Sequence, residues 1–409
     1  MRVLVLTQVV VYPADAGPKI KTLHVIEHLA ADHEVTYCTF TRNEQDRHNA
    51  EQLATLCSRV ATVPMQRSRV SDLRYLVESL AHNDSFILRR DDRPAMHATV
   101  RQLIEEERID VIHVDQLNMM RFIPADWNGP VILDEHNAVW QVFERLRTGS
   151  HNPLVRWLLK REVRCIRRLE AAACRRARTV LAVSQQDKRS LLALIDEGTS
   201  LQEVDIEVIP ITVDVEKLQP IYAARAPQPG RLLTIGTMFW PPNSEGVSWW
   251  LREGYALLQR TCPDVVYDIV GARPASNVQQ AARQHTGVML HGYVADATPF
   301  WTQTSALVVP LLSGGGVRVK ILEAMAMGVP VISTQIGCEG LDVQHEEHLL
   351  IADTPAELAQ ACTRLLGDPE LAHRLAQNAH QLIVEQYAST IALQKLDTVY
   401  QQLATSIYA

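Results

Sequence analysis

The chain has few of the features that reveal a function at first sight. Its 7 cysteines are scattered, without a CxxC or CxxxC pair, so the sequence indicates neither a zinc site nor a disulfide framework. No apolar run approaches the ~20 residues that cross a bilayer. The sequence also contains no Asp-x-Asp pair of the kind that binds a divalent cation, no P-loop and no GxGxxG fingerprint.

Composition and charge are those of an ordinary globular protein. Hydrophobic residues make up 47% of the 409 residues and charged residues 21%. The net charge of −7 argues against a nucleic-acid partner. The first apolar run, Met1–Leu6, is too short for the core of a signal peptide, and the irregular cysteine spacing favours reduced thiols. We therefore expect a cytoplasmic protein, with a peripheral position at the inner face of the membrane as the alternative.

The length indicates two domains of roughly 200 residues each. Short apolar runs predict strands at 1–10, 35–40, 111–114, 131–133 and 180–183, and again at 207–209, 231–235, 266–270, 288–290, 306–309, 329–333 and 348–351. Helical patterns lie between them, which is typical of a doubly wound α/β architecture. The proline-rich stretch 219–230 is the clearest linker, so we expect domains at 1–220 and 221–389.

The most informative segment is 313–330. A predicted strand ends at Val309, three glycines (Gly314, Gly315 and Gly316) follow, and an apolar-periodic helix then runs to Gly328. A glycine loop that leads into a helix presents free backbone N–H groups and the positive end of the helix dipole. Both suit a phosphate, so the segment predicts a phosphate site.

Three side chains of this segment extend that prediction. Arg318 and Lys320 add positive charge to the same turn. Lys320 and Glu323, three residues apart, share a face of the helix. A carboxylate one turn inside a phosphate-binding helix is well placed to hold the two hydroxyls of a ribose. The spacing therefore predicts a nucleoside diphosphate lying along the end of the helix.

The segment resembles the donor-site signature of the retaining GT-B glycosyltransferases of family 4, in the variant GGG-x-R-x-K-I-L-E-A-M-A. Further stretches follow in the family's order, at 208–214, 233–243, 269–271, 290–294 and 333–341. The resemblance implies a GT-B fold, in which two doubly wound, Rossmann-like domains face each other across a cleft. The C-terminal domain would bind the donor nucleotide and the other most of the acceptor. A closing helix at about 390–409 would pack back on the first domain.

The resemblance also assigns donor-binding residues in the second domain. They are Gly314, Gly315, Gly316, Val317, Glu323, Gly236, Asn243, Tyr293 and Val294. Contacts to the base are expected from backbone groups near 291–294. Asn243 has an alternative role, because an asparagine at that place could cap the helix that follows.

Two departures from the family pattern concern charge. The first glutamate of the family's E-x7-E pair contacts the donor sugar, and in this chain Gly315 stands in its place. The loop 236–243 lacks the family's Arg…Lys pair, which grips the diphosphate. We therefore expect Arg318 and Lys320 to act as the catalytic cations that neutralise the leaving diphosphate, without a metal or any other cofactor.

In the first domain, His136 follows the predicted strand 131–133 within the polar run 134–137. The carboxyl end of a parallel strand is where α/β sheets bind ligands. His136 resembles the family histidine near the reacting sugar carbon, where it would help to orient the donor, and a structural role is the alternative. His113 and Asp115 follow the preceding strand and are weaker candidates.

A second pair of first-domain candidates is Gly17 and Lys19, which come after the first strand. They resemble the family's flexible loop near the diphosphate and the acceptor. Simple turn chemistry, with a cation at the start of a helix, is the alternative. Both interpretations stand at this point.

The segment between Arg156 and Arg178 is strongly basic. It contains nine Lys or Arg residues and two Glu in an otherwise acidic protein, and Trp157, Leu158 and Leu159 lie near its start. A basic amphipathic helix can dock on an anionic membrane, and some relatives use lipid-linked acceptors. The alternative is a solvated helix whose arginines pair with acidic patches elsewhere.

The expected activity is transfer of a sugar from a nucleoside-diphosphate sugar, with retention at the anomeric carbon. The acceptor, a glycan, a lipid-linked molecule or a small molecule, is not identified. No pair of carboxylates at glycosidase spacing is evident, so a double displacement has no obvious nucleophile. The family's front-face mechanism, in which the departing phosphate helps to deprotonate the acceptor, is compatible with that absence. Two alternatives stay open: a GT-B epimerase or phosphorylase, and a nucleotide-binding protein without turnover.

Overall fold

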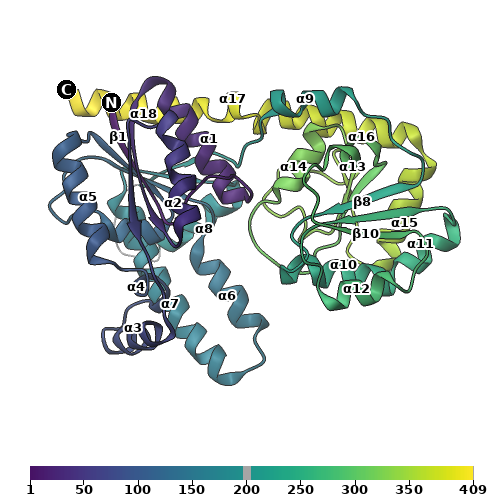
Figure 1. Cartoon of the computed structure of the whole chain (residues 1–409), viewed down its shortest axis with the longest axis horizontal. Helices are drawn as coiled ribbons and strands as arrows, with labels where there is room; N and C mark the ends of the chain where they lie inside the picture. Colours follow the sequence, from purple (N-terminus) through teal and green to yellow (C-terminus); the bar gives the residue numbers. More distant parts are fainter. Residues whose placement is uncertain (197–203, 409) are drawn as a thin grey trace. The chain divides into compact units, whose positions relative to one another are not determined.

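The chain folds into two compact α/β units (Figure 1). The computed structural model describes residues 1–196 and 204–408. The first unit comprises residues 1–211 together with the C-terminal segment from Leu393, and the second comprises 212–392.

The first unit is built on a seven-stranded sheet in the order β3-β2-β1-β4-β5-β6-β7, and every neighbouring pair is parallel. Its strands are β1 (Arg2–Thr7), β2 (Glu34–Thr41), β3 (Arg59–Pro64), β4 (Val111–Asp115), β5 (Val131–Glu135), β6 (Thr179–Ala182) and β7 (Asp205–Val208). The central strands are buried along their length, which explains their near-continuous apolar sequences.

Helices cover both faces of this sheet. They are α1 (Gly17–Asp32), α2 (Glu44–Glu51), α3 (Arg69–Ala81), α4 (Phe86–Arg89), α5 (Pro94–Glu107), α6 (Val139–Gly149), α7 (Pro153–Arg176), α8 (Gln185–Asp196) and α18 (Gln394–Tyr408), with 3-10 turns η1 (Gln52–Thr55) and η2 (Leu117–Phe122). Two hydrophobic clusters result, one on each face. Leu396 and Tyr400 of α18 belong to the same cluster as Val3 of β1, so the last helix is part of the first unit's core.

The edge strand β3 was not predicted from the sequence. It is half-buried along most of its length and ends at Pro64, whose missing N–H is tolerated at a sheet edge. The first strand is also shorter than expected, since it ends at Thr7 and not at Val10. The pattern of apolar runs thus found the central strands and the half-buried edge strand β10 (Val288–Gly292) but missed β3.

The second unit contains a six-stranded sheet in the order β10-β9-β8-β11-β12-β13, again parallel throughout. Its strands are β8 (Arg231–Ile235), β9 (Val266–Val270), β10 (Val288–Gly292), β11 (Ala306–Val309), β12 (Val331–Ser333) and β13 (Leu350–Ile351). Its helices are α9 (Val215–Ala223), α10 (Pro241–Glu253), α11 (Tyr255–Thr261), α12 (Ser276–Ala282), α13 (Thr298–Gln303), α14 (Val319–Ala326), α15 (Pro355–Gly367), α16 (Pro369–Leu382) and α17 (Ser389–Ala392), with a π-helical turn η3 (Ile383–Tyr387). Both units therefore have the doubly wound α/β architecture that the sequence predicts.

The boundary between the units lies at 211/212, earlier than the expected 220/221. The proline-rich stretch that was expected to be a linker packs on the second unit. Tyr222 of α9 stacks on His380, with ring centroids 4.5 Å apart. Arg225 donates to the main-chain carbonyls of Trp301 and Thr304. The backbone N–H groups of Ala226 and Gln228 also donate to the carbonyl oxygens of Thr302 and Gln303. Because these contacts hold much of 219–230 on the second unit, its prolines do not make it a linker.

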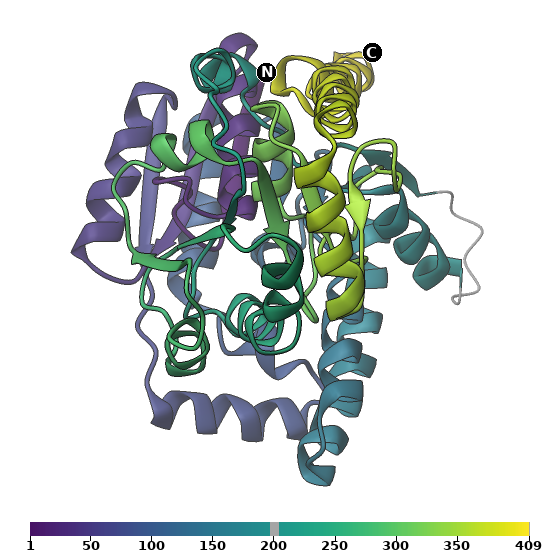
Figure 2. The ribbon, with the colours of Figure 1, turned by 90° about the vertical axis from the view of Figure 1, so that its right-hand side faces the viewer.

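The basic segment forms α7, a helix of 24 residues (Figure 2). Four of its arginines donate to main-chain carbonyl oxygens: Arg161 to Ser79 and Asp84, Arg168 to Asn83, Arg175 to Ile195, and Arg176 to Pro124. The helix therefore uses part of its charge to fix neighbouring loops of its own unit. Among the described residues, α7 included, no helix is both long and apolar enough to cross a membrane.

Candidate functional site

The carboxyl edge of the second sheet brings the predicted donor residues together. Gly236 follows β8 and Gly271 follows β9, and a Cβ atom at Gly271 would lie 1.8 Å from the carbonyl oxygen of Gly236. Gly246 of α10 is just as close to the loop after β11, because a Cβ there would lie 2.1 Å from the Pro310 oxygen. Glycine is required at these positions by close backbone approach. As a result, the N-terminus of α10 reaches the glycine loop, where Pro242 lies near Gly314.

The glycine loop has the backbone conformation that its composition predicts. Gly314 has φ +115° and Gly316 has φ +79°, in a region that side chains disfavour. Arg318 donates to the carbonyl oxygens of Gly315 and Gly316, so its guanidinium folds back over the loop. Helix α14 begins at Val319 without a side-chain cap, and its first N–H groups therefore remain suited to an anion.

Lys320 connects three elements of the site. Its Nζ donates to the carbonyl oxygen of Ile235 at 3.1 Å and to Oδ1 of Asn243 at 3.0 Å. An ammonium group has three donors, so one is left for a ligand oxygen. Burial and the charge of Arg318 lower the pKa of Lys320 to about 8. The group is thus a cation at neutral pH that a phosphate would stabilise further.

Asn243 holds Lys320 and does not cap a helix. The cap position of α10 belongs to Trp240, and Asn243 lies one turn inside the helix. Its side-chain amide donates to the carbonyl oxygen of Thr237 at 3.1 Å while its oxygen accepts from Lys320. The capping alternative is therefore wrong. The helix starts three residues earlier than an Asn243 cap requires, at Pro241, and proline is favoured in the first turn.

Glu323 lies one turn into α14, on the face that it shares with Lys320, and is half-buried. Burial raises its pKa to about 7. A half-buried carboxyl group with a raised pKa binds a proton or a hydrogen-bond donor readily. The predicted ribose contact would supply two such donors.

The loop after β10 contributes an exposed ring. The Tyr293 side chain is 78% exposed, and Val294 beside it is half-buried. His291 lies inward of both, where its Nε2 is 2.7 Å from Oδ1 of Asp268. Asp268 also accepts from Arg231. The His291 side chain is therefore held by β9, and the backbone of 292–294 is what this loop can offer to a base.

In the first unit, His136 lies at the carboxyl edge of the sheet, as predicted, but is 3% exposed. Its Nε2 is 3.0 Å from Oδ1 of Asp115, and its Nδ1 is 3.3 Å from Nε2 of Gln116. Asp115 also accepts from the hydroxyl of Thr22. His136 and Asp115, which the sequence treated as separate candidates, thus form one pair. This pairing fixes the orientation of the imidazole ring.

A buried ion pair close to His136 was not predicted from the sequence. Lys21 of α1 and Asp134 of β5 are both buried and bonded to each other. Burial alone would raise the pKa of Asp134, but the charge of Lys21, aided by His113 and His136, holds it well below its usual range. His113 in turn bonds to the hydroxyl of Tyr400 in α18. A signal was present, because Lys21 shares the four-residue spacing of the buried Val25 and Leu29.

Two buried glutamates complete this region. Glu135 is buried at the end of β5, and burial together with the charges of Glu170 and Asp134 raises its pKa well above the usual range. Glu170 accepts from the backbone N–H groups of Val139 and Trp140, and so binds the start of α6. Burial raises the pKa of Glu170 to about 7. The two glutamates thus belong to the protein's interior.

Gly17 and Lys19 lie at the start of α1. Gly17 is its first residue, and Nζ of Lys19 is 2.9 Å from Oδ1 of Asp15 in the preceding loop. Nζ also lies 3.4 Å from the carbonyl oxygen of Pro13. These contacts match the turn interpretation and leave the proposed role toward a ligand untested.

Two family models match the chain. One, described as Glycosyltransferase Family 4, covers residues 21–217, and the other, described as Glycosyl transferases group 1, covers residues 229–368. A Klebsiella pneumoniae protein described as an uncharacterized 44.6 kDa protein in the cps region is 27% identical over 170 residues. These are 39% of this chain and 42% of that protein, so the match spans less than half of the relative's length.

Solved structures share the architecture over nearly the whole chain. Sucrose-phosphate synthase of Thermosynechococcus elongatus matches 99% of this chain and 100% of its own, with a TM-score of 0.69 and 19% identity. HepE of Anabaena, solved with UDP and glucose, matches 98% of this chain and 100% of its own, with a TM-score of 0.66 and 14% identity. The expected fold class, two parallel-sheet domains of the GT-B type, is thereby confirmed.

The raised pKa of Glu323 predicts a pH-dependent stability. Because the folded-state pKa of about 7 is above the ordinary 4.5, this group stabilises the fold below about pH 4.5 and loses that contribution as pH rises through 7. Glu323→Gln should therefore gain stability relative to the parent between about pH 5 and about pH 8, by up to about 3 kcal/mol. Urea denaturation at both pH values measures this. If the variant and the parent differed in unfolding free energy by the same amount at both pH values, the prediction would be contradicted. Glu245→Gln, at an exposed position of α10, is the control.

Proposed function

We propose that this GT-B glycosyltransferase moves a sugar from a nucleoside-diphosphate sugar to an acceptor hydroxyl, with retention at the anomeric carbon and without a metal. The observation that carries the proposal is the geometry around Lys320 and Glu323. An uncapped helix start, a cation and a half-buried carboxyl group lie within one and a half turns of α14. This order of groups suits a diphosphate followed by a ribose.

The proposed role of each group follows from its chemistry. The N–H groups at the start of α14 and the third donor of Lys320 would bind the diphosphate oxygens. Arg318 would contribute charge from the position where it folds over the glycine loop. Glu323 as a carboxylate would accept from the ribose hydroxyls. Since the leaving group is then stabilised by charges already in place, no divalent cation is needed.

The proposal includes retention of configuration at the anomeric carbon. It is supported by the motif at 313–330 and by the match to the Glycosyltransferase Family 4 model. The departing phosphate would take the proton of the acceptor hydroxyl on the same face of the sugar. No carboxylate is required at Gly315 for that proton transfer, because the leaving oxygen performs it. HepE, which was solved with UDP and glucose, makes UDP the first nucleotide to test.

The deciding experiment is binding and turnover with a panel of UDP-, GDP- and dTDP-sugars. A ligand at 100 times its dissociation constant should stabilise the protein by about 2.7 kcal/mol, which a thermal shift detects. Product analysis then separates transfer from epimerisation or phosphorolysis. Binding without any product, in the presence of a broad acceptor set, would support the alternative of a nucleotide-binding protein.

The first prediction on nucleotide binding concerns Glu323→Ala. It should weaken the donor and the free nucleoside diphosphate alike, because the ribose is common to both. The loss of a charged hydrogen-bond partner should cost about 1.5–3 kcal/mol, or roughly ten- to hundredfold in dissociation constant. Isothermal titration calorimetry measures this. Unchanged affinity in a folded variant would remove Glu323 from the ribose site, and Glu245→Ala is the matched control.

A second prediction concerns Lys320→Met, which keeps the apolar stem and removes the charge. It should lose roughly ten- to hundredfold in nucleoside-diphosphate affinity and keep nucleoside affinity, because a nucleoside carries no phosphate. In the parent protein, affinity for the sugar nucleotide should fall as pH rises through about 8, where Lys320 becomes neutral.

The same assays include two comparisons. Lys217→Met, at an exposed position of α9, should change neither affinity, and turnover of the parent protein should survive EDTA. Turnover that requires a metal, or a Lys320→Met variant with parental diphosphate affinity, would show that the leaving charge is neutralised elsewhere.

A third prediction concerns His136, whose proposed role lies in the sugar-transfer step. The motivating observation is its fixed orientation beside Asp115. His136→Ala should lower kcat by at least tenfold and leave nucleotide affinity within about twofold, because the nucleotide groups belong to the other unit. His136→Gln, which keeps a polar side chain, controls for loss of packing. Parental kcat at saturating donor in His136→Ala would exclude it from the reaction.

A further inference from the structure

Helix α3 has an apolar stripe that faces solvent. Val70, Leu73, Val77 and Leu80 recur at helical spacing and are all exposed. Val70, at 81%, is the most exposed of the large apolar side chains that the structure describes. Ser79 is the single buried residue among the 13 of this helix. Core packing therefore does not explain why this helix is amphipathic.

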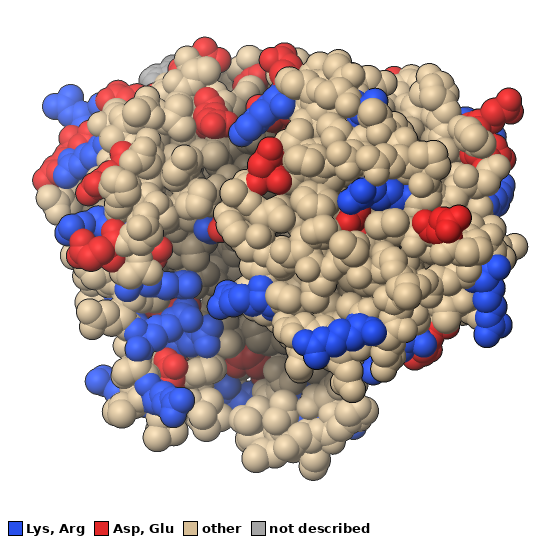
Figure 3. Space-filling view, turned by 45° about the vertical axis from the view of Figure 1, so that its right-hand side comes forward, with Lys and Arg blue, Asp and Glu red and all other residues tan. Residues whose placement is uncertain are grey.

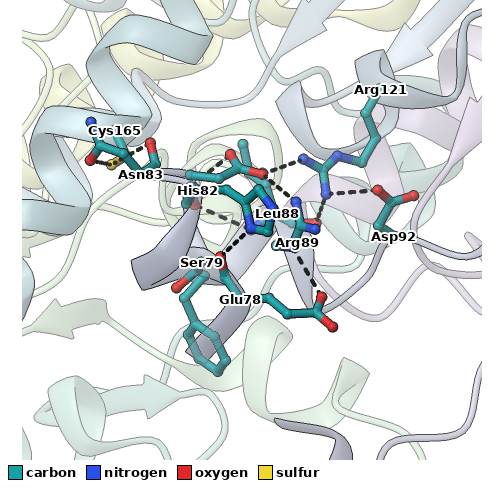
Figure 4. A network of polar contacts seen from close by, with 12 residues as sticks. Glu78, Ser79, His82, Asn83, Leu88, Arg89, Asp92, Arg121 and Cys165 are labelled. Atoms are coloured by element: carbon teal, nitrogen blue, oxygen red, sulfur yellow. Dashed lines mark hydrogen bonds and ion pairs between the residues drawn. The ribbon is translucent and has the colours of Figure 1, made fainter. Parts of the chain in front are cut away.

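A polar network fixes the C-terminal end of α3 (Figure 4). Glu78 lies 3.3 Å from Arg89 of α4, and Arg89 lies 3.4 Å from Asp84. Arg121 of η2 reaches Asp84 at 3.6 Å and Asp92 at 3.5 Å. The C-terminal end of the helix is thus held by ion pairs, while the exposed stripe runs along its whole length.

The start of α7 extends this apolar surface. Arg161 of α7 donates to the carbonyl oxygen of Ser79, so α7 meets the end of α3 at that residue. Trp157 and Leu154 lie four and seven residues before Arg161, on the same face, and both are exposed, Trp157 by 58%. Figure 2 shows α3 running across to the lower end of α7. We call the surface formed by Val70, Leu73, Val77, Leu80, Leu154 and Trp157 the α3–α7 surface.

Exposed cations surround the α3–α7 surface. Arg69, Arg156, Lys160 and Arg164 are exposed around it. No Asp or Glu occurs between residues 145 and 161, and Glu162 is buried, where it accepts from the N–H groups of Phe86 and Ile87 at the start of α4. In the view of Figure 3, Lys and Arg side chains gather at the lower left, with a few Asp and Glu side chains between them.

We propose that the α3–α7 surface docks on an anionic membrane, with the apolar stripe and Trp157 at the level of the headgroups and the cations facing anionic lipid. An exposed apolar helix face, an interfacial tryptophan and flanking cations together are the chemistry that binds such a surface. A second copy of the chain fits less well, because a symmetric contact would bring Arg156, Lys160 and Arg164 of both copies together. The proposal does not depend on the transfer reaction.

This surface differs from the basic helix that the sequence suggested. Arg168, Arg175 and Arg176, further along α7, are engaged with carbonyl oxygens of their own unit. Apart from Arg69 of α3, the cations that can meet lipid are Arg156, Lys160 and Arg164 in the first half of α7, and the apolar contribution comes mainly from α3. The chain's overall charge of −7 is not an obstacle, because the local surface is positive.

The test is sedimentation of the full chain with vesicles of phosphatidylcholine, or of equimolar phosphatidylcholine and phosphatidylglycerol, at low and high salt. We expect binding to the anionic vesicles only, weakened by salt. The triple variant Val70→Ser, Leu73→Ser, Val77→Ser should lose at least tenfold in vesicle affinity. Arg156→Gln with Lys160→Gln should lose about fivefold per cation, on the order of thirtyfold together.

Two matched controls keep the test specific. Leu56→Ser, Val384→Ser and Ile391→Ser remove three exposed apolar side chains elsewhere, and Arg252→Gln with Arg283→Gln removes two exposed cations of the second unit. Both should bind vesicles as the parent does. All the replaced residues are exposed, so the melting temperatures should stay close to that of the parent.

Three outcomes would overturn the proposal. They are equal binding to neutral and anionic vesicles, no binding to either, and a dimer in analytical ultracentrifugation that the Val70→Ser, Leu73→Ser, Val77→Ser variant dissociates. The last would assign the α3–α7 surface to a second copy of the chain. None of these outcomes bears on nucleotide binding, which is measured separately with the Glu323 variants.

Discussion

The ammonium group of Lys320 is the contact on which the second unit's site depends. It joins α14, on which it lies, to the end of β8 through Ile235 and to α10 through Asn243. Burying a cation is costly unless its donors are satisfied, and here a carbonyl and an amide oxygen satisfy two of them. The helix start, the glycine loop and the first turn of α10 are thereby fixed around one charge. A phosphate would find the remaining donor already oriented.

The first unit also holds a lysine at the carboxyl end of a strand, but that lysine is paired with a negative charge. Lys21 of α1 also reaches the carboxyl end of a strand, but its partner there is the carboxylate of Asp134. The charge is then neutralised internally, and both groups are buried. His113 lies 3.6 Å from Asp134, and His136 lies 3.0 Å from Asp115 nearby. Lys320 therefore has only neutral oxygen partners in the protein, whereas Lys21 is paired with a carboxylate close to His136.

The arginines of α7 show a third use of a cation. The guanidinium groups of Arg161, Arg168, Arg175 and Arg176 bind carbonyl oxygens of neighbouring loops. A planar group with five donors suits this task, because it can satisfy several acceptors that lack a partner in regular structure. Positive charge also lies at the exposed beginning of the helix, on Arg156 and Lys160. There it lies next to the apolar stripe of α3, which no core contact requires.

The sequence by itself determined the features that depend on local order. The buried runs of the central strands, the glycine loop at 314–316, the start of α14 and the spacing of Lys320 and Glu323 could all be predicted, since periodicity and turn chemistry act over a few residues. The half-buried edge strand β3 was not predicted. The packing of the expected linker 219–230 on the second unit was not predicted either, because it depends on contacts with Trp301, Thr304 and His380, which are distant in sequence.

Only the tertiary structure decided the partners of the charged groups. Lys320 and Asn243 are 77 residues apart in sequence, and Lys21 and Asp134 are 113 apart. It also decided that Asn243 holds a lysine and caps no helix, and that burial raises the pKa of Glu323 to about 7. No spacing rule reaches such distances. The packing of the strands and helices determines which side chains are in contact and how far each is exposed to solvent.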